Sequence, residues 1–444
     1  MKKVLYAIFF LSVLIQSCKK DDNDVTTTQT KIGDASIYSG DIAIKWIDLF
    51  RYVAKREALN PPVASRYFAY AGVAMYESVV TGANNYNSLA NQLNGSLSIP
   101  TFRYQNLDYE IACDEAMYVV AKNVLNRNIS STSNDTIEKL RLHILNQKRN
   151  NINEQLFNSS IEYGRAIGNT IVAWASGDNY STIRTNTYTV PSRSENQMFW
   201  APTDAVSLRP VEPFWGEMRP FTMAASTSCY VASQIPFSTT IGSDFYNQAM
   251  EVVTVKENLT IEQEHIAMWW ADVPGQTPSP AGHWLNIASI IATQENLNLI
   301  QAAEMYALVG LAVGDAFISC WEAKYRVNLL RPKTYIRDYI AGQSNWEPKW
   351  ATPPFPEYTS GHSVCSGASA TVLKHLFGDI TFVDNTNTFL GINERTYTTF
   401  NQAADEAAIS RLYGGIHYRE AIEFGIEQGN KVGNTIIDRV TTKN

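Results

Sequence analysis

Three short segments between residues 321 and 417 carry side chains whose types and spacing could surround one oxyanion. The first is a lysine followed after six residues by Arg-Pro, the second is Ser-Gly-His, and the third is Ser-Arg followed after five residues by a histidine. The residues concerned are Lys324, Arg331, Ser360, Gly361, His362, Arg411 and His417. Arginine offers forked donors that match the oxygens of an oxyanion, and lysine adds a point charge. The set therefore suits a tetrahedral or trigonal-bipyramidal oxyanion.

The Ser-Gly-His segment directly precedes an apolar run with helical spacing. The N-terminus of such a helix offers free N–H groups and the positive end of the helix dipole, and glycine lets the backbone approach an anion closely. Each segment alone also has an ordinary structural explanation. A lysine and an arginine seven residues apart commonly share a solvated face, and Ser-Gly-His commonly caps a helix. The order and separations of all three segments together indicate a site.

Lys-x6-Arg-Pro, Ser-Gly-His and Ser-Arg-x5-His together resemble the signature shared by vanadium-dependent haloperoxidases and type 2 phosphatidic acid phosphatases, over roughly residues 260 to 440. The resemblance implies an all-α fold of helical bundles, with the oxyanion site in the C-terminal four-helix bundle, and vanadate (V5+) as the cofactor. By motif position, the residues implied to bind its oxygens are Lys324, Arg331, Ser360, Gly361 and Arg411. His417 is implied to be the axial vanadium ligand, or the nucleophile of a phosphatase. His362 is implied to be the acid–base group, and Lys324 also to polarise bound peroxide.

One position after the last motif histidine departs from the pattern of the phosphatases. They usually carry an Asp four residues after that histidine, whereas this chain has Ala421, with Glu420 beside it. Without a carboxylate partner, a nucleophilic His417 would be poorly oriented and less basic. A carboxylate from elsewhere in the chain could substitute. The departure favours the peroxidase over the phosphatase without deciding between them.

Two aromatic residues flank the motifs and bear on the choice of halide. Trp321 lies three residues before Lys324, and Phe355 lies five before Ser360. Both positions are aromatic in the fungal chloroperoxidases that the chain resembles, whereas algal bromoperoxidases carry His in place of Phe355. The two residues could also be simple core aromatics. The chain further resembles secreted haloperoxidases of marine Bacteroidetes, some of which prefer iodide, in its 269–275 and 280–284 stretches.

We therefore predict a vanadium-dependent haloperoxidase that oxidises iodide, with bromide as a weaker substrate, using hydrogen peroxide to form hypohalous acid. The catalytic residues would be His362, Lys324 and His417. One alternative is an acid phosphatase of the same superfamily with His417 as nucleophile, and another is a non-catalytic anion-binding surface lipoprotein. The remaining histidines, among them His283, lack metal-ligand spacing, and we expect His283 to be a satisfied structural histidine.

The first residues have the pattern of a targeting signal. Two lysines precede the apolar run 4–15, which is too short to be a membrane span. The tetrad at 15–18 resembles a bacterial lipobox, so we expect residues 1–17 to be a signal peptide, Cys18 to be lipidated and 18–40 to be a tether. The acidic run after Cys18 resembles a surface-export signal. The protein is thus expected to be exported to the cell envelope, with membrane contact only through a lipid anchor.

From residue 41 onwards, apolar residues recur nearer to every 3.6 residues than to every second residue, which predicts helices. The predicted helices are 42–53, 63–80, 111–124, 137–145, 153–174, 245–255, 261–270, 281–293, 297–325, 363–377, 403–413 and 417–439. Residues 177–245 are rich in Ser, Thr, Asn and Pro, and we expect a long irregular connection with short hairpins at most. The predicted regions are an N-terminal helical region over 41–245 and the site-bearing bundle over 246–444.

The composition is that of an ordinary globular protein. Of 444 residues, 45% are hydrophobic and 18% are charged, which excludes a disordered chain. The net charge is −7 and no basic block runs along the chain, so nucleic acid is not an expected partner. The partners we expect are hydrogen peroxide and a halide. Four cysteines follow Cys18, and the sequence leaves open whether they pair.

Overall fold

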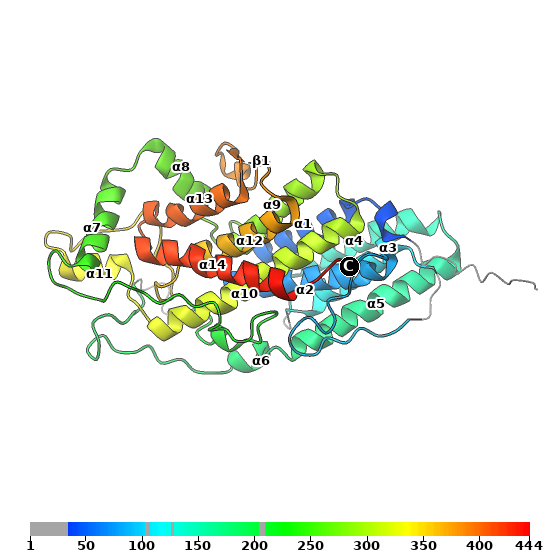
Figure 1. Ribbon diagram of the computed structural model, residues 1–444, viewed down its shortest axis with the longest axis horizontal. Coiled ribbons are helices and arrows are strands. Elements are labelled where there is room, and N and C mark those ends of the chain that lie inside the picture. The colour runs from blue at the N-terminus through cyan, green and yellow to red at the C-terminus, as the bar shows by residue number, and fades with distance from the viewer. Residues whose placement is uncertain (1–33, 103–105, 126–127, 204–208) are drawn as a thin grey trace, which may run out of the picture.

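The computed structural model describes residues 34–102, 106–125, 128–203 and 209–444, and this part of the chain is almost entirely helical (Figure 1). The helices before the long connection are α1 (Asp41–Arg56), α2 (Pro61–Val79), α3 (Tyr109–Asn123), α4 (Ser131–Arg149), α5 (Glu154–Ser176) and α6 (Tyr180–Ile183). Those after it are α7 (Asp244–Glu257), α8 (Ile261–Trp269), α9 (Ser279–Gln294), α10 (Leu299–Val327), α11 (Pro332–Tyr339), α12 (Gly361–Phe377), α13 (Phe400–Tyr413) and α14 (Arg419–Arg439). The predicted all-α fold is confirmed.

The remaining regular elements are short. They are the 3-10 helices η1 (Ala35–Ile37), η2 (Val80–Gly82), η3 (Trp215–Glu217) and η4 (Thr388–Leu390), and the antiparallel strands β1 (Phe382–Asp384) and β2 (Arg395–Tyr397). The predicted signal peptide, Cys18 and most of the predicted tether lie outside the described residues. The division of the chain near residue 245 stays a prediction.

The helices begin where the sequence supplies capping side chains. Asn60 accepts the N–H of Val63 at 3.1 Å, and proline occupies the first position of α2. α10 begins with a capping box, in which the side chains of Asn298 and Gln301 each accept the other's backbone N–H at 3.1 Å. α10 ends at Asn328, whose φ of 54° is tolerated by asparagine. That turn redirects the chain towards Arg331.

α2 and α10 form the centre of the molecule and are buried along most of their length. In Figure 1 they lie between α3, α4 and α5 at one end and α7, α8 and α11 at the other. A Cβ on Gly72 would lie 2.4 Å from the carbonyl oxygen of Tyr306, so only glycine allows α2 and α10 to approach this closely. α10 is long and apolar enough to cross a membrane, but its apolar window is wholly buried inside the protein.

α12 and α14 make a second close contact, which places the Ser-Gly-His segment. A Cβ on Gly429 of α14 would lie 2.3 Å from the carbonyl oxygen of Val364 in α12. At the start of the same pair, the N–H of Ser360 donates to the carbonyl oxygen of Ala421 at 3.0 Å. The N-terminus of α12 is therefore fixed beside the turn that carries His417.

The segment 177–245 contains α6, η3 and the start of α7, and its other described residues lie in no helix or strand. It is tied to the helices by specific contacts. Asp315 of α10 accepts the N–H groups of Phe221 at 2.6 Å and Thr222 at 2.8 Å. The N–H of Trp200 donates to the carbonyl oxygen of Asn328 at 2.8 Å. These contacts hold the connection against the middle of α10, at Asp315, and against the turn after α10, at Asn328.

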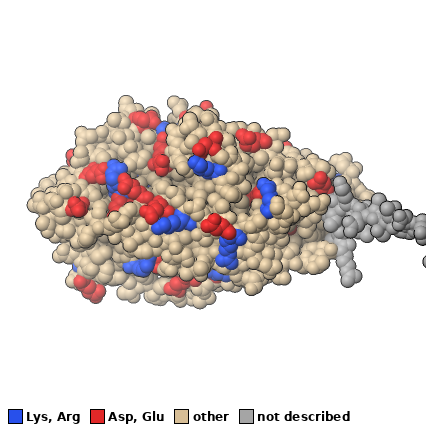
Figure 2. Space-filling view, in the orientation of Figure 1, with Lys and Arg blue, Asp and Glu red and all other residues tan. Residues whose placement is uncertain are grey.

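Charged side chains are interspersed over a largely uncharged surface on the face shown in Figure 2. Exposed ion pairs such as Lys431–Glu427, at 2.8 Å, each contribute little to stability because both partners remain solvated. The apolar core contributes much more, and it includes residues from Ala35 to Val440. The four described cysteines, Cys113, Cys229, Cys320 and Cys365, are all buried and free.

Candidate functional site: an oxyanion cage at the end of the bundle

The seven motif residues come from five elements that meet at one place. Lys324 lies in the last turn of α10, and Arg331 is the N-cap of α11. Ser360 is the N-cap of α12, which begins with Gly361 and His362. Arg411 lies in the last turn of α13, and His417 lies in the turn before α14. A cavity of about 50 Å³ lies among them, lined by Gly361, His362, Arg411 and His417 together with aromatic and proline side chains.

His417 is held in a single tautomer by two partners. Its Nδ1 lies 2.7 Å from Oε1 of Glu357, and its Nε2 accepts an N–H from Nη1 of Arg331 at 3.1 Å. Because Nε2 is an acceptor, the ring proton must be on Nδ1. Burial, Arg331 and Lys324 hold the pKa of His417 well below its usual range. His417 is therefore neutral, which is the form that binds a metal, and its Nε2 lone pair would become available to a metal once the Arg331 N–H moves away.

Glu357 is the carboxylate from elsewhere in the chain that the sequence left open. His417 does not lack a carboxylate partner, because Glu357 occupies that role in place of a residue at position 421. Burial raises the pKa of Glu357 to about 7, although Arg331 and Lys324 act to lower it. Glu420 instead accepts the N–H groups of Gln234 and Ile235. The residue at Ala421 therefore no longer favours the peroxidase over the phosphatase.

The two arginines of the cage keep buried donors that have no partner in the described part of the chain. Arg331 donates to the carbonyl oxygens of Phe355 and Ile416, both at 2.9 Å, but its Nη2 is unpaired. Arg411 donates to the carbonyl oxygen of Trp270 at 2.6 Å, but its Nε is unpaired. Burial lowers the pKa of each guanidinium to about 10, so both remain charged at neutral pH. Buried cationic donors without acceptors suit an incoming anion.

Lys324 is buried and its ammonium group points at the loop before α12. It donates to the carbonyl oxygens of Pro356 at 3.1 Å, Glu357 at 2.9 Å and Thr359 at 2.6 Å. Burial lowers its pKa to about 7. All three donors are occupied in this arrangement, so Lys324 gives the cage a charge and would donate to an oxyanion only after releasing one carbonyl.

The Ser-Gly-His segment combines a helix cap with a ligand surface. The Oγ of Ser360 accepts the N–H of Ser363 at 3.3 Å, which leaves its hydroxyl hydrogen free to donate. A Cβ on Gly361 would lie 3.5 Å from the ring of Trp321, and the glycine thus keeps open the space between the helix end and that ring. The geometry of this segment is compatible both with a helix cap and with a binding site for an oxyanion.

Trp321 and Phe355 form an apolar wall of the cavity. Their ring centroids lie 4.9 Å apart, and the Nζ of Lys324 lies 5.1 Å from the centroid of Phe355. The indole N–H of Trp321 is satisfied by the carbonyl oxygen of Val211 at 3.0 Å. Trp321 is also almost fully buried, so it contributes to the core and to the site at once.

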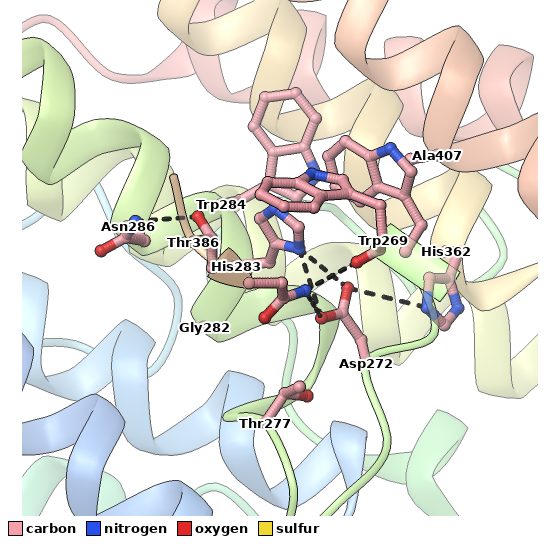
Figure 3. Close-up of polar contacts among 12 residues, drawn as sticks. Trp269, Asp272, Thr277, Gly282, His283, Trp284, Asn286, His362, Thr386 and Ala407 are labelled. Carbon is pink, nitrogen blue, oxygen red and sulfur yellow. Dashed lines mark hydrogen bonds and ion pairs between the residues drawn. The ribbon is translucent and has the colours of Figure 1, made fainter. Parts of the chain in front are cut away.

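His362 lies at the edge of the cavity, and its side chain is 15% exposed. Among the described residues its Nε2 has no hydrogen-bond partner, and it lies 3.9 Å from Oδ2 of Asp272, the contact that a dashed line marks in Figure 3. Burial, Arg411 and His283 hold its pKa well below the usual range. The ring is therefore uncharged at neutral pH, which is the state that a general base needs before the reaction.

The sequence did not indicate Glu357, Asp272 or Asp384 as part of the site. Glu357 lies three residues before Ser360, so its nearness to the motif was the one available signal. Asp272 and Asp384 lie far from the motifs along the chain. His283 is buried with both ring nitrogens paired, as expected of a satisfied histidine, but its partner Asp272 faces His362.

Comparisons with known proteins extend the likeness beyond the motifs. A family model described as the VCPO second helical-bundle domain matches residues 304–443. The vanadium chloroperoxidase of Curvularia inaequalis is 30% identical over 95 residues, which are 18% of this chain and 15% of that protein. The chain thus spans a small part of the length of this curated relative.

Two solved structures resemble the whole chain. The crystal structure of the first bacterial vanadium-dependent iodoperoxidase has a TM-score of 0.85 and 38% identity, and the match covers 92% of this chain and 98% of that one. A holo-type bacterial vanadium-dependent chloroperoxidase has a TM-score of 0.63 at 15% identity, covering 86% and 93% of the two chains, which is a likeness of fold. Both matches cover most of the chain.

Proposed function

Because this chain belongs to the vanadium-dependent haloperoxidases, we propose that it oxidises iodide with hydrogen peroxide to hypoiodous acid, with bromide as a weaker substrate. The observation that carries the choice of iodide is the 38% identity to an iodoperoxidase over nearly the whole of that structure. The balanced reaction consumes one halide ion, one molecule of hydrogen peroxide and one proton, and yields one molecule each of hypohalous acid and water.

The cage fits vanadate in charge and in donor chemistry. The unpaired donors of Arg331 and Arg411 and the Nε2 lone pair of neutral His417 are buried together. His417 would be the protein ligand to vanadium, and Lys324, Arg331, Ser360, Gly361 and Arg411 would hold the oxygens. When bound, vanadate supplies a Lewis-acidic centre that activates peroxide without changing its own oxidation state.

The protein residues would orient the reactants and move the proton. The Nε2 of His362 is unpaired, so it can accept a proton from hydrogen peroxide entering the cavity and return it to the water that leaves. Arg331, Arg411 and Lys324 would stabilise negative charge that shifts between oxygens as the O–O bond breaks. The Trp321–Phe355 wall offers an apolar surface to iodide, which is large and weakly hydrated.

A second candidate is a phosphatase that uses His417 as nucleophile. The observation that favours it is the 2.7 Å contact between His417 and Glu357, since a nucleophilic histidine needs such a carboxylate. The same contact also suits a metal-ligating histidine, so it is compatible with both reactions.

A halide panel on the apoprotein separates the two candidates. Iodide oxidation by hydrogen peroxide should appear when orthovanadate is added and should be suppressed competitively by phosphate. Phosphomonoesterase activity without any vanadate-dependent peroxidase activity would overturn the proposal and favour the phosphatase. We also propose that the protein is exported and anchored to the cell envelope through Cys18.

A further inference from the structure

Behind His362 lies a buried group of three side chains that the proposed function does not use. His283 of α9 lies between Asp272, in the loop after α8, and Asp384 of β1. Its Nδ1 is 3.0 Å from Oδ2 and 3.2 Å from Oδ1 of Asp272, and its Nε2 is 2.8 Å from Oδ2 of Asp384. All three side chains are 0% exposed. Figure 3 shows Asp272 between the rings of His283 and His362.

The geometry requires a positive charge on His283. Ionised carboxylates only accept hydrogen bonds, and a neutral imidazole has one N–H to donate. Because both ring nitrogens face carboxylate oxygens, the ring must carry two N–H groups. Burial alone would lower the pKa of His283, but Asp272 and Asp384 raise it to about 10. Two carboxylates and one imidazolium leave the group with a net charge of −1.

His283 is held firmly on the side away from His362. Asp384 accepts the indole N–H of Trp269 at 2.9 Å and the backbone N–H of Thr386 at 3.0 Å. The ring of Trp270 stacks on that of His283, with centroids 4.1 Å apart and an interplanar angle of 16°. Asp272 is held more weakly by groups other than His283, since Asn387 donates to it at the long distance of 3.4 Å. His283 is therefore the main group that fixes the Asp272 carboxylate.

We propose that His283 is a positioning residue for His362: it holds the Asp272 carboxylate 3.9 Å from Nε2 of that ring, near enough to interact with it electrostatically and beyond hydrogen-bond distance. His362 thereby keeps a free Nε2 for the reacting proton. The inference rests on the proposed function only in taking His362 as the acid–base group.

The positively charged groups around His362 oppose its protonation. Arg411 of α13, Lys324 of α10 and His283 itself all act to lower its pKa, whereas Asp272 is the carboxylate within 4 Å of it. On the far side, Arg51 of α1 interacts with Asp384 and donates to the carbonyl oxygen of Gly282 at 3.0 Å. If His283 no longer held Asp272, the carboxylate would close on His362, raise its pKa and occupy Nε2.

Three variants of the apoprotein isolate this role at constant charge. In D384N, His283 can become neutral and still donate to Asp272, so the net charge of the group stays at −1. In H283F/D384N the donor is lost while the charge remains −1, with the single carboxylate on Asp272. In H283Q/D384N an amide N–H can donate to Asp272 again. The readout is the pKa of His362 from 15N-histidine NMR titration, assigned with His362→Gln.

The pKa of His362 in H283F/D384N should exceed that in D384N by about one unit or more, a tenfold change in proton affinity. H283Q/D384N should restore the D384N value, and vanadate affinity should stay within about threefold in all three, because His417 is untouched. An unchanged or lowered pKa in H283F/D384N, or a parallel loss of vanadate affinity, would overturn the proposal.

The wild-type apoprotein provides a measurement that depends on no variant folding. Both ring nitrogens of His283 should carry protons at pH 7, and a ring without a proton on Nδ1, the nitrogen that faces Asp272, would overturn the proposal by itself. Iodide oxidation with added vanadate is measured separately. If the wild type lacked it while the NMR results held, the proposed function would fail and the positioning of His362 by His283 would stand.

Discussion

Glu357→Gln tests whether the carboxylate behind His417 prepares it to bind vanadate. Glu357 is fully buried, and its Oε1 accepts both the Nδ1–H of His417 at 2.7 Å and the N–H of Tyr418 at 3.0 Å. Its Oε2 has no hydrogen-bond partner in the part of the chain that the structure describes. A glutamine can keep both hydrogen bonds through its single oxygen, with its amide nitrogen in place of Oε2. The substitution thus removes the charge and leaves the geometry nearly unchanged.

Glu357→Gln should lower the affinity for vanadate by about 10- to 100-fold, which is the usual effect of removing the hydrogen-bond partner of a metal-ligating histidine. That corresponds to about 1.4–2.7 kcal/mol, at about 1.4 kcal/mol per factor of ten. Since burial raises the pKa of Glu357 to about 7, the wild-type carboxylate is charged at pH 8 and mostly protonated at pH 6. The difference between wild type and variant should therefore be large at pH 8 and small at pH 6.

The assay is calorimetric titration of the apoprotein with orthovanadate at both pH values. Glu420→Gln is the matched control, because that carboxylate lies in the same region but binds Ser233 and the backbone of Gln234 and Ile235 instead. Equal vanadate affinity of wild type and Glu357→Gln at pH 8 would refute the reasoning. So would an equal loss in the control variant.

Four further predictions follow from the site and the chain start. His417→Ala should abolish vanadate binding, whereas His362→Ala should keep it and lose about 10²–10⁴-fold in turnover; indistinguishable variants would contradict these roles. Burial lowers the pKa of Lys324 to about 7, so vanadate affinity should fall by up to about tenfold per unit as pH rises above it, and Lys324→Arg should flatten this slope. Phe355→His should raise the rate of bromide oxidation relative to iodide, because histidine can donate a hydrogen bond towards the reacting oxygen; substantial chloride oxidation by the wild type would defeat the underlying preference. Cys18→Ala should make the protein soluble, and mass spectrometry of the native chain should find a lipid on Cys18.

The helices were predictable because their apolar residues repeat with helical period and their starts carry capping residues. The predicted span 153–174 and the observed α5 (Glu154–Ser176) differ by two residues at most. α11 was missed because it has only eight residues and follows an irregular turn. The hairpin of β1 and β2 was missed because three residues per strand are too few to establish a period of two.

The site was predictable to the extent that its residues lie in local motifs. Four of the seven motif residues, Gly361, His362, Arg411 and His417, line one cavity. The roles of all seven stay predictions. The pairing of Glu357 with His417 joins residues 60 apart, and that of His283 with Asp384 joins residues 101 apart. No local spacing encodes such pairs, because they depend on how α9, α12 and the hairpin pack together. The sequence allowed the expectation that His283 has hydrogen-bond partners. It did not allow the expectation that one of those partners faces His362.

The burial of Cys320 bears on how long such an enzyme would survive its own product. Its Sγ lies behind the cage, 3.5 Å from the carbonyl oxygen of Thr359, and it is 0% exposed. Burial raises the pKa of this thiol, so it remains protonated, and the thiolate is the form that hypohalous acids attack fastest. Gly361 and the ring of Trp321 lie on the cavity side of the sulfur. An oxidant released into the cavity would thus reach the side chains that line it before it reached this sulfur, which favours a Cys320 that stays reduced.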